Sequence, residues 1–127
     1  MADNQADQEL VNLGDHKHSG IDGSVQYRTY TESDGWEDWS ENGEINGKPD
    51  GTKRLEAIQI RLTGKAAEKY DIYYRVHCQD YGWLDWAKNG EKAGSEGYSR
   101  RMEAIEVRLV TRGNVAPGNM NNCFYEK

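Results

Sequence analysis

Residues 25–62, VQYRTYTESDGWEDWSENGEINGKPDGTKRLEAIQIRL, recur at residues 72–109 as IYYRVHCQDYGWLDWAKNGEKAGSEGYSRRMEAIEVRL. The two segments, called repeat one and repeat two, align without a gap at a spacing of 47 residues, and 16 of the 38 aligned pairs are identical. A fixed spacing of this size is typical of a protein in which one small structural unit is copied and the copies pack together. A duplicated site also favours repeated weak binding over a single catalytic centre.

The alternation of side chains at both ends of each repeat predicts β-strands, because successive side chains of a strand point to opposite faces. The opening strand of repeat two would bury the face formed by Ile72, Tyr74, Val76 and Cys78. The closing strands would bury Ile58, Ile60 and Leu62 in repeat one and Ile105, Val107 and Leu109 in repeat two. A short third strand is expected in between, at residues 38–40 and 85–87.

Four glycines separate the strands of each repeat and leave no room for a long helix there. We therefore expect an all-β fold in which two tandem repeats of about 47 residues pack as a pseudo-twofold sandwich or a prism-like domain. A β-trefoil would need a third unit. Residues 1–24 are interpreted as an extended N-terminal arm for docking or oligomerisation, residues 25–118 as the repeat domain and residues 119–127 as a C-terminal tail.

The composition restricts the partners. The 127 residues carry a net charge of −6 and are 35% hydrophobic, so one domain with a small core is expected. The acidic balance argues against binding to a nucleic-acid backbone, which needs clustered lysine and arginine. No run of about 18 apolar residues predicts a membrane span, and residues 1–20 have neither the basic nor the apolar region of an export signal.

Two cysteines, Cys78 and Cys123, have no spacing typical of a metal site. A free Cys78 thiol on a buried strand face is the favoured interpretation. A Cys78–Cys123 disulfide is the less favoured alternative, because disulfides are typical of exported proteins and no export signal is found.

Two dense motifs carry a family resemblance. The first is G-W-x-D-W-x-x-N-G-E-x-x-G at residues 35–47 and 82–94, and the second is R-x-E-A-I-x-[IV]-R-L at residues 54–62 and 101–109. With YRVH at residues 74–77 and VAPG at residues 115–118, they resemble the ChW repeat, the clostridial hydrophobic repeat with a characteristic tryptophan. The resemblance covers about residues 25–118.

Resemblance to ChW repeats implies a surface or adhesion module, because such repeats are found in Gram-positive surface and secreted proteins, often beside hydrolase or adhesion modules. They are thought to act in adhesion to cell-surface glycans or proteins, and no catalytic residue set belongs to the family. Family members usually follow an export signal, and residues 1–20 show none.

A duplicated sugar-stacking platform is the predicted ligand site. An indole can pack against the C–H face of a pyranose while nearby polar groups bind its hydroxyls. The first tryptophan of each motif is expected in the core and the second at an exposed rim. The predicted ligand-binding residues are Trp39, Asp38, Asn42 and Glu44 in repeat one and Trp86, Asp85, Asn89 and Glu91 in repeat two. The structural alternative is that the tryptophans form the core and that the Asn-Gly pairs form tight turns.

An arginine and a glutamate of each repeat fall on the same face of the closing strand as the residues predicted to be buried. They are Arg54 and Glu56 in repeat one and Arg101 and Glu103 in repeat two. A charge on a core face is costly unless it is paired. We therefore expect an internal Arg–Glu ion pair in each repeat, with a ligand site as the alternative.

His16 and His18 form a His-x-His segment that resembles short stretches of phage tail fibres and spikes. In a homotrimer, three such segments could offer six imidazole nitrogens to one transition metal. The alternative is a polar arm without metal. No other cofactor is expected.

Enzymatic activity is not expected. His77 occurs in one repeat only, and no nucleophile–base arrangement is present. The Glu56/Glu103 pair could in principle cleave glycosides, but the neighbouring arginines would keep both carboxylates ionised.

The predicted function is non-enzymatic adhesion to a bacterial cell-surface glycan or protein. We expect the domain on a virion surface, as a phage decoration, head-fibre or tail-associated protein whose arm contacts virion structural proteins. The alternatives are a fragment of a secreted Gram-positive cell-surface protein and a purely structural virion protein without a ligand.

Overall fold

The computed structural model describes residues 23–32, 34–51 and 53–127, and it shows the predicted strands at both ends of each repeat. In repeat one, β1 (Val25–Thr31) pairs antiparallel with β4 (Leu55–Leu62). In repeat two, β5 (Tyr70–Cys78) pairs in the same way with β9 (Met102–Thr111). The all-β prediction is therefore confirmed.

Short strands line the other edge of each opening strand. They are β2 (Gly35–Trp36) and β3 (Ser40–Glu41) beside β1, and β6 (Gly82–Trp83) and β7 (Ala87–Lys88) beside β5. The expected third strand therefore lies two residues later than the sequence indicated, and a further short strand precedes it.

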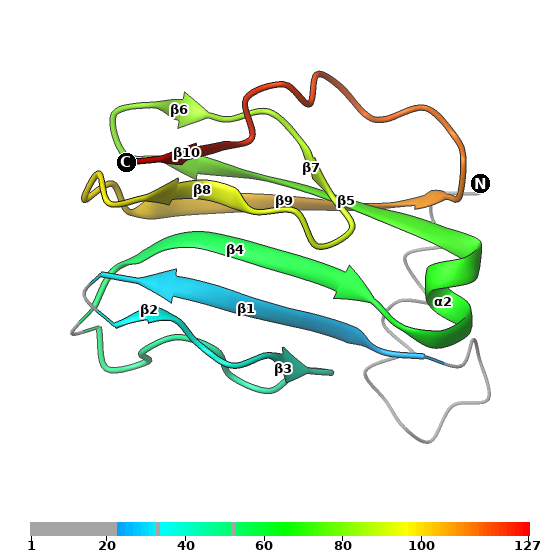
Figure 1. Ribbon diagram of the computed structural model, residues 1–127, viewed down its shortest axis with the longest axis horizontal. Coiled ribbons are helices and arrows are strands. Elements are labelled where there is room, and N and C mark those ends of the chain that lie inside the picture. The colour runs from blue at the N-terminus through cyan, green and yellow to red at the C-terminus, as the bar shows by residue number, and fades with distance from the viewer. Residues whose placement is uncertain (1–22, 33, 52) are drawn as a thin grey trace.

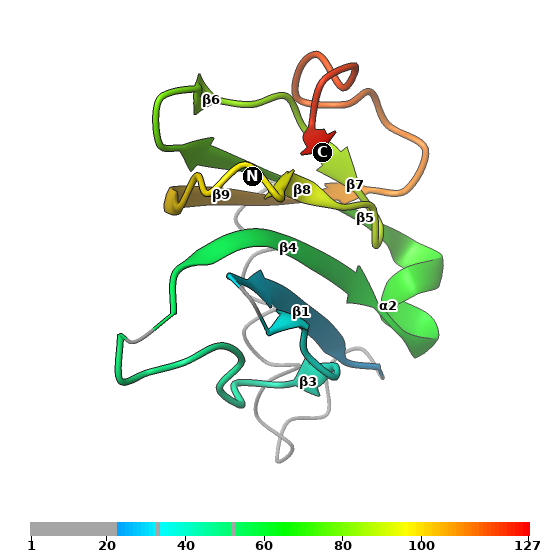
Figure 2. The ribbon, with the colours of Figure 1, turned by 60° about the vertical axis from the view of Figure 1, so that its left-hand side comes forward.

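The described strands form two sheets, each built around the opening and closing strands of one repeat, and the sheets lie as two layers (Figure 1). Helix α2 (Gly64–Lys69) joins them at one end, where the sequence had indicated only a linker (Figure 2). Ser24, assigned to the arm from its sequence, is buried against this connection, and its amide donates to the Thr63 hydroxyl oxygen at 3.0 Å.

The core lies between β4 and β5. The predicted buried face of β5 is confirmed, since Ile72, Tyr74, Val76 and Cys78 are all essentially inaccessible and pack with Ile60 of β4. The Tyr74 hydroxyl donates to the Glu91 carbonyl oxygen, which fixes the turn after β7 to the core. Period-two alternation therefore identified the strand that holds both layers together.

Strand β8 (Ala93–Glu96) belongs to repeat two in sequence but to the sheet of repeat one in space. It pairs antiparallel with β4, with Gly94 opposite Ala57 and Ala93 opposite Ile58. On its other edge it carries β10 (Phe124–Glu126), which runs parallel to it. The two-sheet sandwich is as expected, but this strand exchange departs from exact twofold symmetry, because no described segment of repeat one joins the sheet of repeat two.

One prediction about the buried faces is wrong. Ile105 and Val107 of β9 are 42% and 43% exposed, whereas their equivalents Ile58 and Ile60 are half-buried and buried. The physical reason is that β8 closes the outer edge of β4, and no described strand closes the outer edge of β9. Only Leu109 of the predicted trio in repeat two is buried.

Cys78 and Cys123 are both free thiols, as the favoured interpretation expected for Cys78. Cys78 is buried in the core, and burial raises its pKa to about 11. Cys123 packs against the same core, and its thiol lies 3.4 Å from the Lys92 carbonyl oxygen. The tail that carries Cys123 runs back to β10 past the β6–β7 side of repeat two (Figures 1 and 2).

Candidate functional site

Each repeat stacks an arginine against its two tryptophans. In repeat one the Arg28 guanidinium carbon lies 5.2 Å from the ring centre of Trp36 and 5.0 Å from that of Trp39. In repeat two Arg75 lies 4.7 Å from Trp83 and 5.0 Å from Trp86. Cations over indole faces are attracted by the ring quadrupole.

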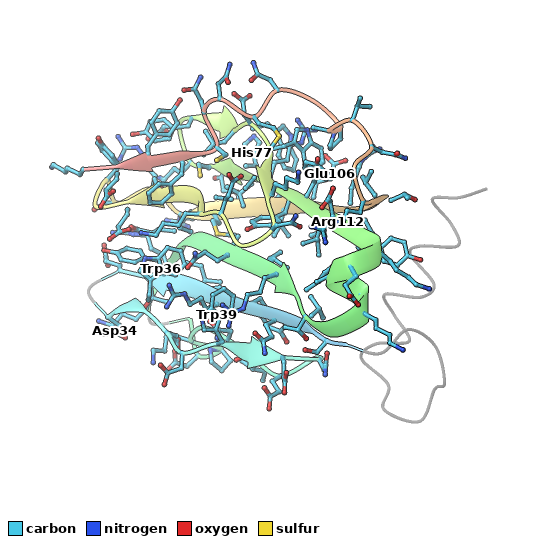
Figure 3. All side chains as sticks on the ribbon, turned by 45° about the vertical axis from the view of Figure 1, so that its right-hand side comes forward. Asp34, Trp36, Trp39, His77, Glu106 and Arg112 are labelled. Carbon is cyan, nitrogen blue, oxygen red and sulfur yellow. The ribbon has the colours of Figure 1, made fainter. Side chains whose placement is uncertain are left out.

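The stack continues with a second arginine in each repeat. The Arg61 guanidinium carbon lies 3.7 Å from the Trp39 ring centre, and that of Arg108 lies 6.0 Å from the Trp86 ring centre. Figure 3 labels Trp36 and Trp39, the two rings that Arg28 contacts in repeat one. Four of the 16 identical pairs therefore belong to two copies of one Trp–Arg stack, which we call the ladder.

The predicted exposure of the tryptophans is wrong in repeat two. Trp83, expected in the core, is 44% exposed, and Trp86, expected at the rim, is only 6% exposed. The tail covers Trp86, because the Trp86 amide donates to the Asn119 carbonyl oxygen at 2.9 Å and Gly118 lies directly against the indole. In repeat one Trp36 and Trp39 are both half-buried, so neither matches its predicted environment fully.

The asparagines of the predicted site hold the turns, as the structural alternative stated. Asn42 and Asn89 adopt positive φ angles of 50° and 47°. Their side-chain oxygens accept the amides of Val25 at 3.2 Å and Ile72 at 2.8 Å, which ties each turn to its opening strand.

The predicted glutamates act in the same turns. The Glu44 carboxylate accepts the Glu41 amide at 2.9 Å, and the Glu91 carboxylate accepts the Lys88 amide at 2.8 Å. Asp38 is exposed, and its backbone carbonyl oxygen accepts a hydrogen bond from the Asn46 side-chain amide. A binding role for these residues, for Trp39 and for Trp86 stays a prediction.

The internal Arg–Glu ion pair is present in repeat one. Arg54 Nε lies 3.1 Å from a carboxylate oxygen of Glu56, which is 2% exposed. In repeat two the prediction is wrong, because Glu103 is exposed and its carboxylate instead lies 3.0 Å from His77 Nδ1. The uncovered edge of β9 explains this difference too: Glu103 is exposed to water, so its charge does not need the internal arginine partner that a buried carboxylate needs.

An aromatic cleft of about 560 Å³ opens at one end of repeat two. Its walls come from three separate segments of the chain. They carry Asp80, Tyr81, Trp83, Leu84, Asp85, Tyr98, Asn122 and Tyr125. The rings support one another, since the Tyr81 centroid lies 6.4 Å from Tyr98 and 5.6 Å from Tyr125. Tyr81, Trp83 and Tyr125 are all exposed. Arg75 already stacks on Trp83 and Arg100 on Tyr81, so a ligand would contact the parts of these rings that the arginines leave open.

The two carboxylates of the cleft are held by neighbours. Asp80 lies 3.2 Å from Arg100 Nε, and the Arg100 guanidinium carbon lies 5.7 Å from the Tyr81 ring centre. Asp85 accepts the Asn122 amide at 2.9 Å, while its own amide donates to the Asn122 carbonyl oxygen at 3.1 Å. Asp85 is thus the one member of the predicted ligand set that the structure brings to this cleft.

Sequence reasoning missed most of the cleft, because it looked for identity between the repeats. Where repeat two has Tyr81 and Tyr98, repeat one has Asp34 and Gly51. Asp34 marks the corresponding corner of repeat one in Figure 3. The sequence did contain one indication of the cleft: repeat two has tyrosines at positions where the two repeats differ.

No metal site is found in the part of the chain that the structure describes, where no group of three histidine, cysteine or acidic side chains is suited to hold an ion. His16 and His18, on which the predicted transition-metal site depends, lie outside the described residues. No described helix has the length and apolar character needed to cross a membrane.

Comparison with known families gives one match, found twice. The model of the family described as Clostridial hydrophobic W matches residues 30–64 and residues 77–111, one match in each repeat. No curated protein and no solved structure matches the chain.

Proposed function

Because the chain belongs to the Clostridial hydrophobic W family, we propose that it is a non-enzymatic adhesion module that binds a bacterial cell-surface glycan in the aromatic cleft of repeat two. Membership of this family is consistent with a cell-surface or adhesion-type module. The glycan and the cleft as its site are the specific parts of the proposal.

One observation carries it: three exposed aromatic rings, Tyr81, Trp83 and Tyr125, converge on one cleft. Binding sites for small ligands combine apolar walls with a few fixed polar groups. Here the ring faces would pack on sugar C–H groups, while Asp80, Asp85 and the tyrosine hydroxyls offer hydrogen bonds to sugar hydroxyls. Rings already packed against one another lose little freedom when a ligand binds, which favours affinity.

The charges of the cleft favour a neutral or amino-sugar glycan. Two carboxylates, Asp80 and Asp85, line it, and Arg100 offsets only the first of them. An anionic polymer would meet like charge, which disfavours binding by several kcal/mol at close approach.

The location stays a prediction. A virion surface, with the segment before residue 25 contacting particle proteins or joining three chains, is expected on sequence grounds, and the bacterial cell surface is the alternative. Both settings bring the cleft next to a bacterial wall. A bacterial surface protein as the ligand would need a wider apolar contact than this cleft offers.

Binding of purified, uncharged cell-wall oligosaccharides by calorimetry tests the proposal. Trp83→Ala and Tyr125→Ala should each weaken binding at least roughly tenfold, about 1.4 kcal/mol. Trp36→Ala is the matched control, since it occupies the same motif position and also stacks on an arginine but lines no part of the cleft. Equal loss in Trp36→Ala and Trp83→Ala, or binding unchanged in a folded Trp83→Ala variant, would remove the cleft as the site.

A further inference from the structure

Strands β4 and β9 have nearly the same sequence but very different surroundings. Both contain the E-A-I-x-[IV]-R-L motif, at residues 56–62 and 103–109. The outer edge of β4 is paired with β8, and the pairing is extended by a bond of 2.7 Å from the Gly90 amide to the Ile60 carbonyl oxygen. Within the described ranges, the outer edge of β9 has no strand.

The exposed side chains on β9 are those that β8 covers on β4. Ala57 is fully buried, while its equivalent Ala104 is exposed. Ile105 and Val107, which point to the opposite face of the strand from Ala104, are exposed as well, so apolar side chains flank the open edge. An open edge with an apolar face is a ready template for the addition of another strand.

Repeat one contains the segment that could fill this edge. Residues 46–49 stand at the place that β8 occupies in repeat two, and their glycine has the same backbone conformation: φ is +106° at Gly47 and +117° at Gly94. At Gly94 this conformation permits very close approach to β4, because a Cβ there would lie 2.3 Å from the Glu56 carbonyl oxygen. Gly47 therefore has the backbone shape for the same contact, and within repeat one an ideal Cβ there would lie 3.0 Å from the Leu55 side chain and 3.6 Å from the Thr29 hydroxyl.

We propose that the outer edge of β9 binds residues 46–49 of a second copy of this chain, so that chains associate head to tail. The intramolecular pairing of Ala57 with Gly94 then recurs between chains as Ala104 with Gly47 of the next copy, and Ile105 lies opposite Asn46. The contact is heterologous: each chain has one open edge and one segment that no described strand pairs with. The Asn46 side chain keeps its hydrogen bonds to Thr29, Asp38 and Ser40 of its own chain, so the new contact uses the backbone of the segment. Such contacts give rings or open-ended chains rather than closed twofold dimers.

Charge complementarity supports residues 46–49 of a second copy as the segment that pairs with the edge of β9. Continuing the register by one residue places Lys48 of the next copy opposite Glu103. Both side chains are exposed and their present ion-pair partners are on the surface: Lys48 lies 3.8 Å from Asp34, and Glu103 lies 3.0 Å from His77. Opposite charges at directly opposed positions stabilise antiparallel pairs.

One position makes the contact between chains weaker than the contact within the chain. The Gln59 side-chain amide donates to the Gly90 carbonyl oxygen at 2.8 Å, but its equivalent is Glu106, a carboxylate without a donor that is held by Arg75. Association of separate molecules also costs translational and rotational freedom. The association is therefore expected at high protein concentration, or where many copies are held on one surface.

Site-directed cross-linking of the full chain tests the register. Lys48→Cys and Glu103→Cys, in separate preparations mixed under mild oxidation, should form a disulfide-linked heterodimer, because directly opposed residues have the Cα separation that a disulfide requires. Lys48→Cys mixed with Asn121→Cys is the control, since Asn121 is exposed and its neighbour Asn122 is bound to Asp85, between β6 and β7, rather than to β9. A cross-link no stronger than this control overturns the proposal, as does efficient cross-linking of Glu103→Cys with itself, which would indicate edge-to-edge pairing of two β9 strands.

Sedimentation velocity of the unmodified chain gives a second readout. The mean mass should rise with concentration beyond that of a dimer, and Ile105→Lys should raise the apparent dissociation constant at least tenfold. Ile105 is exposed, so tryptophan fluorescence of this variant should match that of the parent. A monomer at all concentrations overturns the proposal. Association that begins only after removal of residues 1–22 does so too, because it would identify that segment as the occupant of the edge.

Discussion

The guanidinium of Arg61 stacks on the ring of Trp39, with its central carbon 3.7 Å from the ring centre. The corresponding pair in repeat two, Arg108 and Trp86, is separated by 6.0 Å. The contact between the second arginine and the second tryptophan of the ladder is therefore closer in repeat one than in repeat two, where the tail covers Trp86.

Arg61→Ala should lower the free energy of unfolding by about 1 kcal/mol, since a cation over an indole contributes about 0.5–2 kcal/mol depending on its exposure. Arg108→Ala is the matched control and should cost less than about 0.5 kcal/mol. Urea unfolding followed by tryptophan fluorescence measures both. Equal losses in the two variants would show that the ring distance does not determine the contribution.

Gly94→Ala should destabilise the fold strongly, because the new Cβ would meet the Glu56 carbonyl oxygen and Ala57 at the β4–β8 pairing. Gly82→Ala is the control: its φ of +77° is strained for alanine, but the space around it is open. The control should lose about 1–2 kcal/mol from the left-handed backbone alone, and Gly94→Ala should lose at least twice as much. Thermal unfolding, with amide exchange at Ala57, distinguishes them, and similar losses would contradict the close contact.

Glu56→Ala should cost about 1–2 kcal/mol, because it removes the buried carboxylate from the Arg54 guanidinium, which is partly exposed and keeps Glu32 as its second partner. Glu103→Ala occupies the same motif position on the open edge, and its effect should stay within about 0.5 kcal/mol. Chemical denaturation of both variants at neutral pH is the measurement. A large loss in Glu103→Ala would mean that the edge of β9 is covered in solution.

Asp71 should contribute stability that is lost in acid. Burial raises the pKa of this carboxyl, but bonds from the Asn89 side chain and the Gly113 amide, with the charges of Lys88 and Arg112, outweigh burial and hold the pKa below its ordinary value. A carboxyl with a lower pKa in the folded state stabilises the fold above its unfolded pKa of about 3.9, and this stabilisation disappears as the pH falls through the folded pKa.

Urea midpoints of the parent and of Asp71→Asn, measured from pH 7 down to pH 2.5, test this sign. The parent should be the more stable protein at pH 7, and the difference should shrink once the pH falls below about 4. A difference that stays constant over this range would assign the effect of the substitution to packing rather than to charge.

Sequence alone predicted the parts of the fold that depend on local alternation. The buried face of β5 and the Arg54–Glu56 pair follow from side-chain parity within one strand. The errors arose where a distant segment decides burial. Trp86 is covered by the tail at Gly118 and Asn119, and Ile105 is exposed because β8 was placed beside β4 rather than β9.

The cleft was missed for a related reason. Tyr81, Tyr98 and Tyr125 are far apart in sequence, and comparison of the repeats directs attention to identical positions, where the ladder and the turns lie. Only the return of the chain through β10 brings Tyr125 beside Tyr81. No pattern of spacing within a repeat contains this information.

The division between ladder and cleft has a consequence for evolution. The ladder uses residues that the duplication left unchanged, whereas the cleft uses Tyr81 and Tyr98, which have diverged from Asp34 and Gly51 of the sister repeat. Substitutions at these corner positions can alter what is recognised without disturbing the scaffold. A gene carrying such a duplication can therefore explore new receptors with one unit while the other preserves the fold.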